Sequence, residues 1–148
     1  MTFKSEGREY FNERAIATQQ TGFVLIAQMR SWLPDAVGGI LWFGVDNANT
    51  AVLTPMYASI TEIPECYRRG NGSMTEFSWT SAFWIHNWVA NMAYNRYEPM
   101  IRDIRPVQKE LEDSYVDLVK NTDAKALELL KSSPAQATAY LTEVCGKV

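Results

Sequence analysis

The sequence predicts an α+β fold in which a small antiparallel sheet is followed by a helical half. Before about residue 75, short β-rich apolar runs alternate with turn residues, whereas after it apolar residues recur at spacings of three and four. We therefore expect one domain over residues 1–148, with strands and loops in 1–75 and helices in 76–148.

Three runs read as strands that pair in sequence order as an antiparallel meander: Gly22–Arg30, Ile40–Val45 and Thr50–Ala58. Turn residues separate them, namely Pro34-Asp35, Gly38-Gly39 and Asp46–Asn49. Pro55 lies inside the third run and cannot donate to a ladder, so that strand is either an edge strand or broken at this point. Ile63–Ser73 reads as loop.

The helical half divides into four predicted helices. The first runs from about Glu76 to Tyr97, limited by Pro99, and the second begins at Pro106. Asp123 is expected to cap a short third helix. Ser133-Pro134 opens a fourth helix that ends at Gly146.

Three strands cannot form two stacked sheets, so we expect a single sheet covered on one side, mainly by the Glu76–Tyr97 helix. Both faces of the Gly22–Arg30 strand are largely apolar, and the second face must find a partner. A homo-oligomer follows as an expectation, with Trp84 and nearby aromatic residues at the contact.

Composition excludes several classes of protein. Hydrophobic residues make up 47% of the chain, which is enough for a core, and no apolar run approaches the roughly 20 residues that span a bilayer. The net charge is -3 and Arg68-Arg69 is the only adjacent basic pair, which argues against nucleic acid or an anionic membrane as partner. We expect a soluble protein. Whether it works in the cytoplasm or after export stays open.

The residues themselves offer no catalytic constellation. His86 is the only histidine and lies in an aromatic helix, where a packing role is the simpler interpretation. Cys66 and Cys145 have no metal-type spacing and read as structural thiols, although a disulfide between them stays open. No metal or other cofactor is therefore predicted.

The chain resembles the later part of the dipeptidase A and secernin family of cysteine peptidases. The ordered segments that carry the resemblance run from Glu13 to about Asp123: Glu13–Gly22, Gln28–Pro34, Gly39–Asp46, Leu53–Tyr57 and the helix from Phe77 to Tyr97.

The resemblance implies an N-terminal-nucleophile hydrolase fold, with two stacked sheets between helix layers, and a cysteine at the mature N-terminus that attacks a dipeptide. The free α-amine can serve as general base for such a nucleophile. No cysteine lies near the start here, so we expect a non-catalytic C-terminal portion of a dipeptidase. Thr2 would become N-terminal if Met1 were removed, but its polar surroundings disfavour it as a nucleophile.

If part of the substrate cleft lies in this chain, four residues are candidates: Arg30, Asp46, Asn47 and Asn49. They stand at strand ends and turns, where binding groups gather, and an arginine suits the free carboxylate of a dipeptide. A surface arginine and an ordinary polar turn are the simpler interpretation of the same residues. The alternative function is a non-catalytic, self-associating binding or assembly module on a hydrolase-derived scaffold.

Overall fold

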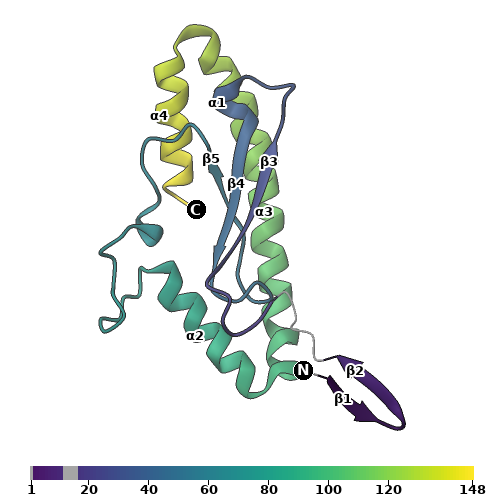
Figure 1. Ribbon diagram of the computed structural model, residues 1–148. Coiled ribbons are helices and arrows are strands. Elements are labelled where there is room, and N and C mark those ends of the chain that lie inside the picture. Colours follow the sequence, from purple (N-terminus) through teal and green to yellow (C-terminus); the bar gives the residue numbers. More distant parts are fainter. Residues whose placement is uncertain (1, 12–16) are drawn as a thin grey trace.

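The computed structural model describes residues 2–11 and 17–148 (Figure 1). Five strands and a short helix come first: β1 (Thr2–Ser5), β2 (Arg8–Phe11), β3 (Phe23–Met29), α1 (Asp35–Gly38), β4 (Gly39–Val45) and β5 (Thr54–Tyr57). A 3-10 turn (Glu65–Tyr67) and three long helices follow: α2 (Ala82–Asn95), α3 (Tyr97–Ser132) and α4 (Pro134–Cys145). The predicted α+β order, with antiparallel strands first and helices second, is confirmed, but the strands form two small sheets and not the single sheet that was predicted. Residues 13–16 of the Glu13–Gly22 segment lie outside the described residues.

The central sheet is the predicted meander, with β3, β4 and β5 paired in that order and antiparallel throughout. The third strand is shorter than predicted and forms one edge of the sheet. Pro55 lies in it opposite Trp42, a position that an edge strand tolerates because one side of its ladder is unpaired.

A second, two-stranded sheet was not predicted. β1 and β2 form a hairpin whose two-residue turn, Glu6-Gly7, has positive φ at both positions (47° and 77°), as the tight turns of twisted hairpins require. Phe3 stacks on Tyr10 with ring centroids 5.5 Å apart, but all eight strand residues are exposed. The hairpin projects away from the central sheet (Figure 1), so the two sheets are not stacked. Thr2 therefore lies in an exposed strand rather than a buried one.

Helix α2 begins at Ala82, and the prediction that it starts near Glu76 was wrong. Polar side chains hold the preceding residues in a loop. The hydroxyl groups of Ser78 and Thr80 donate to the Asn71 side chain, over 2.7 and 3.0 Å. Local bonds of this kind offer the chain an alternative to the helical ladder.

Helix α3 runs unbroken from Tyr97 to Ser132, so the predicted breaks at Pro99, Pro106 and Asp123 were wrong. Pro99 occupies the first turn, where backbone N–H groups have no helical partner. Pro106 is inside the helix but exposed, so water can bond the carbonyl it leaves free. Asp123 pairs with Arg30 instead of capping a helix.

The core lies between the sheet and the last two helices. Its fully packed residues are Val37, Ile40, Tyr57, Val119, Ala126, Leu141 and Cys145. Helices α3 and α4 therefore cover the sheet, and the prediction that the Glu76–Tyr97 helix is the main cover was wrong. The start of α4 is as predicted, since the Ser133 hydroxyl accepts the N–H of Gln136 at 3.3 Å.

Strand β3 is exposed along almost its whole length in the single chain. Apolar side chains of both its faces are open to solvent, with Leu25 48%, Ile26 53% and Met29 78% exposed. Among the described residues, no strand pairs with its outer edge, because the sheet order is β3-β4-β5. An exposed, apolar edge strand is a ready template for pairing with another strand.

Candidate functional site

The most unusual side chain of the chain stands where β4 ends. Asp46 is only 5% exposed, yet its Oδ2 has no hydrogen-bond partner among the described residues. Its backbone is left-handed, with φ of 68°, and its N–H donates to the carbonyl of Gly22 at 2.8 Å. A buried, unpaired carboxylate oxygen and an uncommon backbone conformation both cost free energy, and such costs are often tolerated at functional sites.

Asn47 builds the turn that holds Asp46 in place. It is 1% exposed, and its Oδ1 accepts the N–H of Asn49 at 2.9 Å. Its carbonyl accepts the N–H groups of Thr50 and Ala51, and its amide donates to the hydroxyl of Tyr94 on α2. Asn49 contributes its backbone, while its side chain is exposed. The polar turn is therefore held both by hydrogen bonds within it and by a hydrogen bond to α2.

Helix α2 brings three further polar side chains to this turn, and we name Asp46, Asn47, His86, Asn87 and Tyr94 the strand-end cluster. Burial raises the pKa of Asp46, and Asn87, the N–H of Asn47 and His86 oppose that rise. Burial lowers the pKa of His86, with Asp46 acting against it. At neutral pH the imidazole is therefore uncharged.

Chemically, the cluster offers an acceptor in a water-poor setting. The free Asp46 Oδ2 can accept an N–H from an ammonium or amide group, and the neutral imidazole beside it can donate or accept one proton. Asp46 and Asn47 were predicted as site residues. His86 and Asn87 were missed because their approach to the turn depends on how α2 packs, which no local pattern reveals.

Arg30 lies elsewhere, at the end of β3, and is 7% exposed. Its guanidinium pairs with Asp123 on α3 and donates to the carbonyls of Val37 and Gly38. The hydroxyl of Tyr57 donates to the same carboxylate at 2.7 Å. These contacts use the guanidinium inside the core, which favours a structural role over binding a dipeptide.

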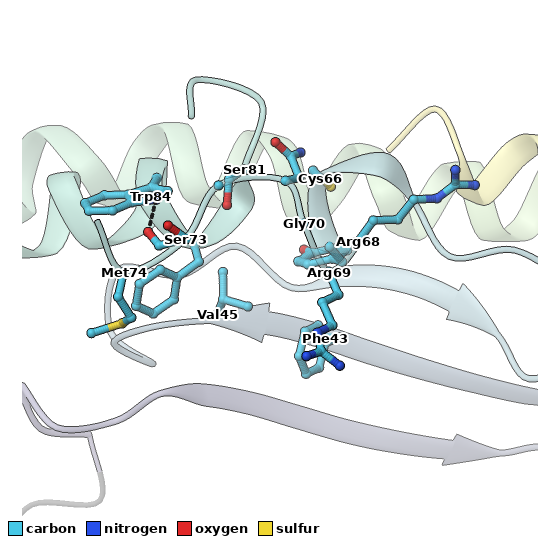
Figure 2. A pocket seen from close by; sticks show the side chains of 14 residues that line it. Phe43, Val45, Cys66, Arg68, Arg69, Gly70, Ser73, Met74, Ser81 and Trp84 are labelled. Atoms are coloured by element: carbon cyan, nitrogen blue, oxygen red, sulfur yellow. Dashed lines mark hydrogen bonds between the residues drawn. The ribbon is translucent and has the colours of Figure 1, made fainter. Parts of the chain in front are cut away.

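A cavity of about 350 Å³ opens near the end of β4 (Figure 2). The last part of β4, the loop of residues 66–74 and the start of α2 line it. Trp84, predicted at a partner contact, is partly buried in this wall and donates its indole N–H to the Ser73 carbonyl at 3.1 Å. Its ring lies close against Gly72, whose φ is 80°.

The two cysteines do not add a nucleophile to this region. Burial is the main cause that raises the pKa of both thiols, so each is protonated at neutral pH. Both are free, with Cys66 on the cavity wall and Cys145 in the core.

Neither a cluster of metal ligands nor a bilayer-spanning helix was found in residues 2–11 and 17–148. No group of three or more His, Cys, Asp or Glu side chains is gathered there as metal ligands would be. None of the helices there is both long and apolar enough to cross a membrane.

Comparison of the sequence with known proteins identifies the family of the chain. A probable dipeptidase from Latilactobacillus sakei is 30% identical over 129 residues, which cover 87% of this chain. The same stretch is 26% of that protein, so the chain spans about a quarter of the length of the curated relative it matches. The family model of Peptidase family C69 matches residues 2–110, which is well over half of the chain. The chain thus belongs to peptidase family C69.

Proposed function

We propose that this chain is a C-terminal structural portion of a dipeptidase, and that the catalytic N-terminal cysteine lies on a part of the protein outside it. The observation that carries the proposal is the family membership together with the match to about a quarter of a probable dipeptidase. Cys66 and Cys145 are free thiols whose pKa is raised by burial, so neither is an activated nucleophile, which suits a non-catalytic portion.

Within this proposal, the strand-end cluster contributes to the wall of the substrate cleft. Asp46 holds an unpaired buried oxygen at a strand end, and a dipeptide carries an ammonium group that such an oxygen would bind. Asn47 holds the backbone next to Asp46 in place through the hydrogen bonds of its turn and its hydrogen bond to the Tyr94 hydroxyl. Asn49 is exposed at the tip of the same turn and can reach a ligand from there.

Two assays test the proposal. The chain alone is expected not to hydrolyse dipeptides, and turnover that survives a thiol-blocking reagent would contradict the non-catalytic role. In the second assay, this chain replaces the matching 129 residues of the Latilactobacillus sakei protein. The chimera is expected to hydrolyse dipeptides and to lose most of that activity on Asp46→Ala, while Asp35→Ala serves as the matched control.

A second candidate function is self-association as a binding or assembly module, and the exposure of β3 favours it. Phe23, Leu25, Ile26 and Met29 are all at least 48% exposed and lie on one edge strand. Single exposed apolar residues are ordinary, but a contiguous run on an unpaired edge is not. Within the dipeptidase proposal, the same surface would be covered by the remainder of the protein.

Sedimentation of the isolated chain tests self-association. A dimer that Ile26→Lys converts to monomer would support pairing through β3. Val107→Lys, at an exposed position of α3 that does not line the hollow formed by Ile26 and Val116, is the control for adding one charge. A monomer at high concentration would leave the module hypothesis without support.

A further inference from the structure

We propose that the cavity between β4, the 66–74 loop and α2 binds the C-terminal residue of a dipeptide, with Arg69 holding its carboxylate and the aromatic walls holding an apolar side chain. The inference rests on the proposed dipeptidase function, and it specifies which substrates that function would favour.

The cavity has the size and the walls for one amino-acid residue. Its volume of about 350 Å³ lies at the lower end of the range for small-molecule sites. Phe43 comes from β4, Met74 from the loop, and Phe83 and Trp84 from α2, so apolar surface approaches from three elements. The Trp84 indole is held by its bond to Ser73 and by contact with Gly72, so that wall is fixed before a ligand arrives.

Two adjacent arginines, Arg68 and Arg69, line the cavity, and they differ in whether the guanidinium is already paired. The guanidinium of Arg68 is paired with Glu62 and Glu65 and donates to the carbonyl of Ile63 at 3.2 Å. Within residues 2–11 and 17–148, no hydrogen bond or ion pair engages Arg69. Figure 2 shows the Arg69 side chain running toward the strand that carries Phe43, while that of Arg68 extends away from it.

An unpaired guanidinium at the mouth of an apolar cavity suits a ligand with one carboxylate next to an apolar group. Guanidinium binds a carboxylate through two parallel hydrogen bonds, a geometry that an amide cannot reproduce. The C-terminal residue of a dipeptide has this chemistry. Cys66, the one thiol on the wall, is protonated, so the cavity is suited to holding a ligand and not to attacking it.

Position relative to the strand-end cluster supports the assignment. Val45 lines the cavity and Asp46 follows it in the chain, so the cavity and the strand-end turn lie at the same end of β4. A dipeptide with its C-terminal side chain in the cavity would direct its remaining length along the end of β4. Its ammonium group would then lie on the side of Asp46, whose buried Oδ2 has no hydrogen-bond partner among the described residues.

Direct binding to the 148-residue chain tests the inference without any turnover. Three probes are titrated: Ala-Phe, Ala-Phe amide and Ala-Gly. The indole N–H resonance of Trp84, assigned with Trp84→Phe, reports whether a probe occupies this cavity. We expect Ala-Phe to saturate with a Kd of about 1 mM, and the amide and Ala-Gly each to bind about tenfold more weakly.

The arginine pair supplies its own matched control. Arg69→Gln is expected to weaken Ala-Phe to the level of the amide, and Arg69→Lys to retain part of the difference. Arg68→Gln removes the same charge one residue away and is expected to leave all three affinities unchanged. Circular dichroism of each variant checks that the fold is intact.

Three results would overturn the inference: no saturable Trp84 shift up to about 10 mM Ala-Phe, equal affinity for acid and amide, or equal loss in the Arg68 and Arg69 variants. Failure of the dipeptidase proposal is read separately, from the inactivity of the chimera. An inactive chimera with selective Ala-Phe binding would leave the cavity assignment standing.

Discussion

Replacing Arg30 with methionine tests whether the buried ion pair between β3 and α3 holds the fold together. The side chains of Arg30 and Asp123 are 7% and 17% exposed, so the substitution leaves a carboxylate largely shielded from water. Breaking one side of a buried pair costs about 3–5 kcal/mol. The Tyr57 hydroxyl still donates to Asp123 at 2.7 Å, which places the expected loss near the lower end, about 3 kcal/mol.

Urea unfolding followed by far-UV circular dichroism measures this loss as a lower midpoint at unchanged slope. The double variant Arg30→Met/Asp123→Leu removes both charges and is expected to recover much of the stability. Arg102→Met, which breaks the exposed pair with Glu98, is the control and should cost under about 0.5 kcal/mol. A loss below about 1 kcal/mol for Arg30→Met would refute the structural assignment of Arg30.

Three further substitutions test other parts of the structure. Asp46→Asn should stabilise the chain by about 1 kcal/mol at pH 7. Because the pKa of Asp46 is raised, its buried carboxylate destabilises the fold at pH values above that pKa. The stability gained by Asp46→Asn should therefore vanish as the pH falls through the raised pKa toward 3.8. A gain that does not depend on pH in urea unfolding would contradict this. Ser133→Ala should cost about 1 kcal/mol by removing the cap of α4, with Ser132→Ala as control. Gly72→Ala should lower the midpoint of thermal unfolding, because φ is 80° and the new Cβ would lie 2.9 Å from Trp84. Gly70→Ala is the control: its φ of 93° is similar but its Cβ would meet open space, so the difference between the two variants measures the clash with Trp84.

The strands of the central sheet were predictable because their signals are local. Apolar runs bounded by Pro-Asp, Gly-Gly and Asp-Asn sequences identify β3, β4 and β5, and short connections lead to antiparallel neighbours. The β1–β2 hairpin was missed because polar residues outnumber apolar ones in its short strands, and its turn, Glu6-Gly7, has glycine at only one of the two positions that need positive φ.

The helices were less predictable because tertiary contacts decide their ends. Pro106 reads as a helix start, yet an exposed face tolerates it inside α3. Asp123 reads as a cap until β3 brings Arg30 to it across 93 residues of sequence. The candidate site divides in the same way. Asp46 and Asn47 stand at a visible turn, whereas His86 reaches them only through the packing of α2 on β4.

The length of α3 affects which parts of the chain unfold locally and which unfold only with the whole domain. Its 36 residues extend over about 54 Å, far beyond the sheet it covers. Buried residues are concentrated in the second half, at Val119, Thr122 and Ala126, while Ile101 stands alone in the first. Pro106, which lies in the first half, also removes one amide hydrogen from the helical ladder there. Amide hydrogens near Val119 should therefore exchange only with global unfolding, whereas those around Val107 should exchange through local fraying. One continuous helix would then contain two segments that unfold independently.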